Sequence, residues 1–195
     1  MQQGGQESLI DEWLATGAES AAVPGWRLIG GYIDEDDERA LVAEIDAHPF
    51  GTDWKRRVQV YGAGYGDDEP AAPLPPLIRA LGERIHRDGL IERAPENAVV
   101  NEYLPGIGIG PHRDYGAFGP TVVGVSLLSW CVIDLIETDG ARRVSVPLPP
   151  RSLYVIGGEA RTRWKHGIAA RRNDIIGGLR VPRQRRLSIT WRTRR

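Results

Sequence analysis

The second half of the chain, from residue 98 onward, consists of short apolar segments separated by turn residues. Segments of this kind are typical of an antiparallel β-barrel or jelly roll. The 24 Gly and 14 Pro of the 195-residue chain favour many turns over a helical bundle. We therefore expect an α+β protein that is mainly β. Its core strands are predicted at residues 98–103, 121–128, 131–136, 144–148, 152–156, 164–168 and 186–192.

The first half carries two helical patterns. Asp34 is suited to cap a helix, because acids follow in the first turn and Leu41 and Ile45 share one face; this helix should end before Pro49. A second helix is expected over residues 77–89, where apolar residues recur at helical spacing.

These patterns suggest one domain over residues 26–195. A helical and lid segment, 26–97, would pack on a β core, 98–195. Two further strands are expected in the first segment, at 26–33 and 55–61. Residues 1–25 are expected to form a partly ordered arm with a short helix over 9–14.

Composition narrows the protein's class and location. Cys131 is the single cysteine, so no intrachain disulfide and no cysteine-built metal site can form. No run of 18 apolar residues is present, and the first residues lack the pattern of a secretory signal. We expect a cytoplasmic monomer that has no membrane partner.

Charge is unevenly distributed along the chain. Residues 161–195 contain 12 Lys and Arg against one acid, a formal charge of +11, whereas residues 1–160 carry −12. This asymmetry predicts either an anionic partner near the C-terminal end, with the basic segment 171–186 steering phosphate, or a solvated face of basic strands.

Two of the four histidines begin an identical triplet, His86-Arg87-Asp88 and His112-Arg113-Asp114. In a strand, residues i and i+2 point to the same face, whereas in a helix they diverge. The first triplet ends a helical pattern, so its members should lie on a helix surface. The second follows a β region, so its side chains can converge on one ion.

A third ligand for such an ion is available at His166, 52 residues beyond Asp114 in a strand-like segment. Two imidazoles and one carboxylate on one face of a barrel form the facial triad of non-haem Fe(II) oxygenases. Mn, Co, Ni or Zn could occupy the same ligands. The alternative is that each histidine serves only the structure.

The last predicted strand alternates with period two, which places Arg186, Ser188, Thr190 and Arg192 on one face. Buried arginines beside hydroxyl groups would form a fork for a dicarboxylate. Asn101 and Tyr103 could share that face and donate further hydrogen bonds. The alternative is that these arginines are solvent-facing edge charges.

Four motifs follow one another here: Asn101-Glu-Tyr103-Leu-Pro-Gly106, His112-Arg-Asp114, His166-Gly-Ile168 and Arg186-Leu-Ser-Ile-Thr-Trp-Arg192. In order and spacing they resemble the AlkB family of Fe(II)/2-oxoglutarate dioxygenases, whose pattern is N-x-Y-x-P-G, H-x-D, H-G-I and R-x-(N/S)-x-T-(F/W)-R. Residues 55–62 also resemble the family's upstream segment. The resemblance implies a double-stranded β-helix (jelly roll) with N-terminal helices packed on the barrel.

The resemblance also implies residue roles. His112, Asp114 and His166 would bind Fe(II). Arg186, helped by Tyr103, would bind the distal carboxylate of 2-oxoglutarate. Asn101 and Arg192 would reach its metal-proximal end, supported by Ser188. The reaction would consume O₂ and 2-oxoglutarate, release succinate and CO₂, and remove an N-methyl group as formaldehyde.

The chain departs from the family's nucleic-acid repair members after Asp114. Those members carry acids there that help to recognise the methylated base, whereas this chain continues Tyr115-Gly-Ala-Phe-Gly-Pro. It therefore resembles more closely the divergent members that act on tRNA wobble modifications or on proteins.

We expect an alkylated nucleic acid, DNA or RNA, as the substrate. A protein or small molecule is the alternative, as is a catalytically silent binding module. The predicted substrate contacts combine charge with aromatic rings, as a phosphate-and-base site requires; they are Arg56, Arg57, Tyr61, Tyr65 and Tyr115.

Overall fold

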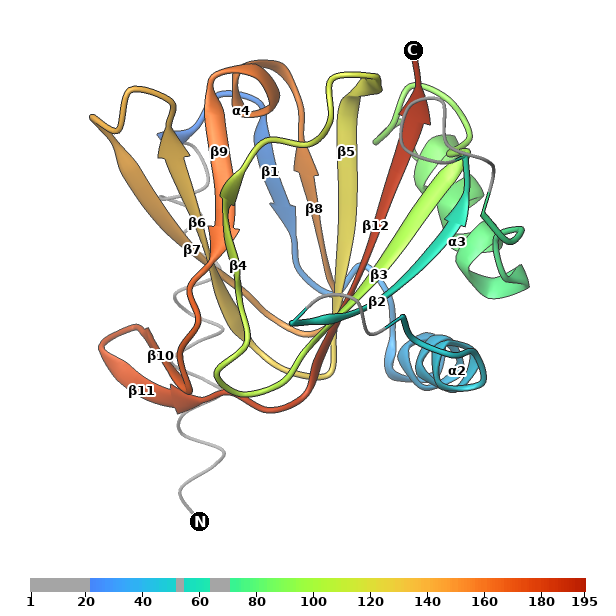
Figure 1. The fold of residues 1–195 in the computed structure, drawn as a ribbon, viewed down its shortest axis with the longest axis horizontal. Helices are drawn as coiled ribbons and strands as arrows, with labels where there is room; N and C mark the ends of the chain where they lie inside the picture. The colour runs from blue at the N-terminus through green and yellow to red at the C-terminus, as the bar shows by residue number, and fades with distance from the viewer. Residues whose placement is uncertain (1–21, 52–54, 64–70) are drawn as a thin grey trace.

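The computed structural model describes residues 22–51, 55–63 and 71–195. The predicted short helix at 9–14 and most of the predicted arm lie outside these residues. The helices are α2 (Glu35–Asp46), α3 (Pro76–Arg87) and α4 (Gly158–Thr162). The strands are β1 (Trp26–Ile29), β2 (Arg57–Gly62), β3 (Asn97–Tyr103), β4 (Ile109–His112), β5 (Phe118–Leu127), β6 (Cys131–Glu137), β7 (Arg143–Leu148), β8 (Ser152–Ile156), β9 (Trp164–Ile168), β10 (Asn173–Ile176), β11 (Leu179–Pro182) and β12 (Arg186–Arg194). Figure 1 shows two facing sheets, with helices α2 and α3 at one side and the short helix α4 at one end near β9.

Two antiparallel sheets form the barrel (Figure 1). The larger sheet has six described strands in the order β1-β8-β5-β12-β3-β2, and the smaller has four in the order β4-β9-β6-β7. Neighbouring strands within each sheet are antiparallel and often distant in sequence, as in a double-stranded β-helix. The predicted mainly β jelly roll is confirmed.

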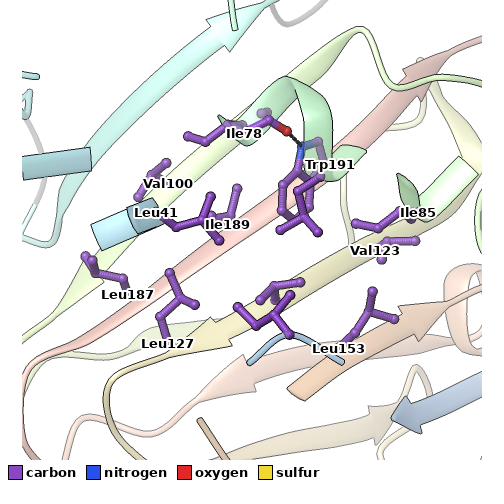
Figure 2. Packing of buried hydrophobic residues seen from close by; sticks show 14 of the residues in the cluster. Leu41, Ile78, Ile85, Val100, Val123, Leu127, Leu153, Leu187, Ile189 and Trp191 are labelled. Atoms are coloured by element: carbon purple, nitrogen blue, oxygen red, sulfur yellow. Dashed lines mark hydrogen bonds between the residues drawn. The ribbon is translucent and has the colours of Figure 1, made fainter. Parts of the chain in front are cut away.

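Helices α2 and α3 cover the outer face of the six-stranded sheet. Asp34 caps α2 as predicted, because its side chain accepts a hydrogen bond from the Asp37 backbone N–H at 2.8 Å. Apolar residues of both helices pack with strand residues in one core (Figure 2). The indole of Trp191 on β12 donates to the Ile78 carbonyl at 3.1 Å, which ties α3 to the strand that carries Arg186 and Arg192.

A second apolar cluster lies on the barrel's inner side. It includes Cys131, Trp164 and Tyr154, and the Trp26 ring stacks on Tyr154 with centroids 5.5 Å apart. Val23 belongs to the same cluster and is 1% exposed, so the final residues of the predicted arm are packed on the barrel. The barrel's packed core therefore begins a few residues before the predicted boundary at 26.

Three features were not predicted as elements: the short strand β4, the short helix α4 and the β10–β11 hairpin. The turn of the hairpin uses Gly177 and Gly178 at positive φ. The hairpin's Asp174 is buried and accepts hydrogen bonds from Arg171 and Arg183, both at 2.6 Å. Arg185 pairs with Asp46 and Glu102, so three of the six arginines of residues 171–186 are paired with carboxylates within the fold. This pairing weakens the hypothesis that the segment steers phosphate.

No helix in the described part of the chain is long and apolar enough to span a membrane.

Candidate metal and co-substrate site

Three predicted metal ligands converge inside the barrel. His112 ends β4 and pairs in register with His166 on β9, and their ring centroids are 4.4 Å apart. Asp114 lies two residues beyond the end of β4, in a short segment without regular secondary structure that brings its carboxylate to the histidines. One possible ligand atom from each of the three residues lies within 4.8 Å of the other two.

One oxygen of the Asp114 carboxylate is hydrogen-bonded, and the other has no hydrogen-bond partner among the described residues. Its Oδ1 accepts hydrogen bonds from Arg192 Nε at 2.8 Å and Nη2 at 2.6 Å. Its Oδ2 is buried, lies 3.5 Å from His166 Nε2 and has no hydrogen-bond partner among the described residues. Burying an acceptor without a donor is unfavourable unless a cation binds to it, so this oxygen is suited to be a metal ligand.

Electrostatics hold Asp114 and His166 in the protonation states that metal binding requires. Burial alone would raise the pKa of Asp114, but Arg192 and the two histidines more than offset it and hold that pKa well below its ordinary value. Burial lowers the pKa of His166 to about 4. A charged carboxylate and a neutral imidazole are therefore present at neutral pH.

The other triplet has no comparable partner. His86 lies on α3 with Nδ1 3.2 Å from the Ile91 carbonyl oxygen, and Asp88 caps the end of that helix. Asp88 accepts a hydrogen bond from the Tyr32 hydroxyl at 2.7 Å. Among the described residues, neither joins a metal-ligand cluster, as their helical position predicts.

A cavity of about 860 Å³ lies between the two sheets and includes all three candidate ligands in its wall. The alternating residues Arg186, Ser188, Thr190 and Arg192 of β12 all line it, as predicted. Asn101 and Tyr103 line it from the adjacent strand β3. The predicted polar face is thus an interior face.

Arg186 provides the strongest anion-binding feature of this cavity. It is 2% exposed, and its Nε donates to Ser126 Oγ at 2.9 Å. Its Nη1 and Nη2 are buried and find no partner within the described residues. The guanidinium lies 5.3 Å from the Tyr103 ring centroid, and burial raises the pKa of Tyr103 to about 12, which keeps its hydroxyl protonated as a donor. Two unpartnered donors beside a phenol fit one carboxylate of 2-oxoglutarate.

The other predicted co-substrate residues differ in their contacts. Asn101 Oδ1 accepts a hydrogen bond from Arg56 Nε at 2.8 Å. Ser188 Oγ lies 3.5 Å from the Tyr154 hydroxyl. Arg192 donates to Asp114, a contact with a candidate metal ligand that the sequence did not predict. Its guanidinium is therefore held by a candidate metal ligand, unlike that of Arg186.

The predicted substrate residues separate into two groups by strand alternation. Arg56 and Tyr115 line the cavity, and Tyr115 is 53% exposed. Arg57 and Tyr61 belong to the opposite face of β2, where Arg57 pairs with Glu102 and Tyr61 is buried in the helix-covered core. Substrate contact by these two residues does not fit their placement. Tyr65 lies outside the described residues.

Three cavity or near-cavity residues were missed. Ser126 accepts a hydrogen bond from Arg186 and thereby orients it; the segment Val125-Ser-Leu127 resembles the family, but no site role was predicted for Ser126. Tyr154 crosses the sheet above Gly124, where a Cβ would overlap its ring; a glycine inside a strand is the available signal. Arg161 of α4 donates to the backbone carbonyls of Asp114 and Tyr115.

Comparison with known proteins agrees with this geometry. The family model of the 2OG-Fe(II) oxygenase superfamily matches residues 31–192. Uncharacterized protein L905 of Acanthamoeba polyphaga mimivirus is 35% identical over 178 residues, which cover 86% of this chain and 84% of that protein. The tRNA (carboxymethyluridine(34)-5-O)-methyltransferase alkbh8 of Xenopus tropicalis is 33% identical over 167 residues, 78% of this chain. The match spans 26% of that longer relative.

A solved structure extends the likeness to the fold. OsALKBH1 superposes with a TM-score of 0.64 at 17% identity and covers 87% of this chain and 98% of its own. Similarity at this identity is similarity of fold. Together with the family match, it shows that the chain is an AlkB-like oxidoreductase of the 2OG-Fe(II) oxygenase superfamily, which implies Fe(II), 2-oxoglutarate and O₂ as its cofactors and co-substrates.

Proposed function

We propose that this enzyme hydroxylates or oxidatively demethylates an alkylated base of a nucleic acid. The observation that carries the proposal is the charge of the cavity wall. Four arginines, Arg56, Arg113, Arg186 and Arg192, face a single carboxylate, Asp114, among the described residues that line it. Such a wall favours anionic ligands.

The proposed roles of the inner residues follow from their unpartnered atoms. His112, Asp114 and His166 would hold the iron, with Asp114 Oδ2 as the open carboxylate ligand. Arg186 and Tyr103 would bind the distal carboxylate of 2-oxoglutarate. With iron and 2-oxoglutarate bound, O₂ would be the oxidant: one oxygen atom would enter the substrate and the other the succinate formed from 2-oxoglutarate, with release of CO₂. The protein orients both groups and limits water in the cavity.

Charge balance then distinguishes the inner from the outer arginines. The metal-proximal carboxylate of the co-substrate would offset part of the charge of Fe(II), and Arg192 pairs with Asp114. Arg186 would be the counter-charge for the distal carboxylate. Arg56 and Arg113 add positive charge to the same wall, and they are the proposed contacts for a phosphodiester or another substrate anion.

The cavity also offers apolar contacts for a base. Tyr115 is half-exposed at the wall and could stack on an aromatic ring, and Val58 and Val60 line the wall from β2. The Xenopus tropicalis relative is named as an enzyme that acts on tRNA. Both observations support a nucleic-acid substrate. The repair members of the family carry acids at the positions after Asp114, and this chain does not, which favours a modified RNA base over a damaged DNA base as the substrate.

Coupled turnover tests this proposal directly. We would measure succinate release with Fe(II), 2-oxoglutarate and one of three additions: modified tRNA, alkylated DNA or methylated peptide. Turnover should rise above the substrate-free rate with a nucleic acid, and formaldehyde should appear if an N-methyl group is removed. His166→Ala is the inactive control.

Variants at the wall sharpen the assignment. Tyr115→Ala should raise KM for the nucleic acid while the substrate-free rate is unchanged. Leu104→Ala is the matched control, because Leu104 is also exposed but does not line the cavity. Stimulation by peptide alone would reject a nucleic-acid substrate, and no 2-oxoglutarate turnover under any condition would indicate a silent binding module.

A further inference from the structure

The segments next to β4 and β9, the strands that carry His112 and His166, exchange hydrogen bonds through two arginines. Arg161, on α4 shortly before β9, donates from Nη1 to the Asp114 carbonyl at 3.1 Å and from Nη2 to the Tyr115 carbonyl at 2.9 Å. Arg113, beside Asp114, donates from Nη1 to the Thr162 carbonyl at 2.7 Å. We call this pair the arginine clasp. It joins the segment before His166 to the segment after His112.

Arg161 is an unusual residue to find at this position. It is 9% exposed, and every hydrogen bond found for it within the described chain goes to a backbone carbonyl rather than to a carboxylate. The Asp114 carboxylate lies near its charge but forms no salt bridge with it. Burying a cation without a salt bridge is unfavourable, and an apolar side chain of similar length would avoid that cost. Stability alone therefore does not explain an arginine here.

The clasp has a clear consequence for Asp114. Arg161 holds the backbone carbonyl of this residue, while Arg192 holds its Oδ1 atom at 2.8 and 2.6 Å. The remaining polar atom, Oδ2, faces His166. With both ends fixed, the carboxylate has little freedom to rotate away from the two imidazoles.

We propose that Arg161 is a positioning residue for the metal site, with Arg113 as the weaker half of the clasp. It fixes the Asp114 loop against α4 and thereby sets the affinity for the metal. The inference rests on the proposed metal-binding role of His112, Asp114 and His166. Because the same guanidinium holds the Tyr115 carbonyl, it also fixes the aromatic residue at the cavity wall.

The shape of arginine suits this role. A planar guanidinium presents donors in a fixed fork, so Nη1 and Nη2 can reach two successive carbonyls at once. The ammonium of lysine is a single point charge that cannot span both in the same way. Arg161→Lys should therefore preserve charge and lose part of the positioning.

Metal titration of the purified metal-free protein tests the proposal without turnover. We would measure Co(II) binding by calorimetry for the wild type, Arg161→Met and Arg161→Lys. Outer residues that orient metal ligands typically contribute about 10–100-fold to affinity. Arg161→Met should weaken Co(II) binding within this range, and Arg161→Lys by less.

Arg163→Met is the matched control, because Arg163 lies two residues away with its side chain 62% exposed and pairs with Glu137 and Glu159. The Co(II) affinity of the Arg163→Met variant should equal that of the wild type. Amide hydrogen exchange in the metal-free proteins provides the second readout. Arg161→Met should speed exchange in residues 113–117 while the core strand β12 exchanges as before.

The outcomes separate the clasp from the metal site itself. If wild type and His166→Ala bind Co(II) equally, the proposed metal site is wrong. If wild type binds and a folded Arg161→Met binds with equal affinity, the clasp is overturned. Should Arg161→Met fail to fold, Arg161→Lys and Arg113→Ala decide: wild-type affinity in both overturns the proposal, and weaker binding in Arg161→Lys supports it.

Discussion

His86-Arg87-Asp88 and His112-Arg113-Asp114 have the same residue types in the same order, but they lie in different backbone settings. The first triplet ends helix α3, where two of its side chains find nearby partners: Ile91 for His86 and Tyr32 for Asp88. The second begins at the end of β4 and faces His166 on β9. Only the second brings three ligand atoms together among the described residues.

The difference shows which backbone setting allows such a triplet to contribute metal ligands. A helix end turns i and i+2 apart and offers nearby carbonyls and hydroxyls, which satisfy both side chains. A strand that ends beside another strand leaves its last residues facing a distant part of the chain. Asp114 therefore keeps a buried oxygen without a donor, whereas Asp88 is satisfied on the surface.

The largest expected contrast is in turnover. His112→Ala and His166→Ala should each abolish succinate formation from 2-oxoglutarate, because each removes a proposed metal ligand, while circular dichroism should remain that of a folded protein. His86→Ala should retain wild-type turnover. Equal losses from His86→Ala and His112→Ala would mean that the two triplets do not differ as proposed.

The two aspartates should differ next in the stability of the metal-free protein. Asp114→Ala leaves Arg192 buried without its carboxylate, and breaking a buried pair in this way costs about 3–5 kcal/mol. Asp88→Ala removes an exposed hydrogen bond from Tyr32 and should cost about 0.5–1.5 kcal/mol. Urea unfolding measures both; a similar cost for the two variants would contradict the contrast.

Arg186 extends the comparison to the co-substrate. Arg186→Met should weaken 2-oxoglutarate binding by about 2–5 kcal/mol, the range for removing one partner of a buried, hydrogen-bonded charge pair. The free protein should lose little stability, because Nη1 and Nη2 have no partner there among the described residues. Calorimetric titration with 2-oxoglutarate is the measurement, and unchanged affinity would exclude Arg186 from the site. Exposed Arg87, in the structural triplet, supplies the control Arg87→Met.

The smallest expected contrast is in the pH dependence of unfolding. Burial lowers the pKa of His166 from 6.5 to about 4, so the folded metal-free protein takes up this proton less readily than the unfolded chain. This contribution to stability is complete above pH 6.5 and is lost as the pH falls toward 4. The free energy of unfolding should therefore fall less between pH 6.5 and 4 in His166→Ala than in the wild type, whereas His86→Ala should show the wild-type fall. Urea unfolding across this interval distinguishes them.

Local signals were sufficient for most of the scaffold. Asp34 and the apolar face behind it predicted α2, and the segments 152–156 and 164–168 match β8 and β9 in both bounds. α4 was missed because five residues are too few to show a helical period. The β10–β11 hairpin was missed because Asp174, whose charge suggests a surface, is buried by Arg171 and Arg183.

The site was predictable where one strand carries several members and less so where distant elements meet. Period-two alternation correctly put Arg186 and Arg192 in one cavity. Applied to β2, the same rule would have separated Arg56 from Arg57 and Tyr61. The contacts of Arg192 and Arg161 with Asp114 join segments far apart in sequence, and no local pattern specifies them.

The burial of Cys131 has a consequence for an enzyme that handles O₂ beside iron. The thiol is packed inside the barrel, and burial raises its pKa, so little of the reactive thiolate forms near neutral pH. Met1 is the chain's only methionine. The protein thus offers few sulfur atoms to stray oxidants, and we expect its inactivation during uncoupled cycles to proceed through damage to other side chains rather than through sulfenic acid or methionine sulfoxide.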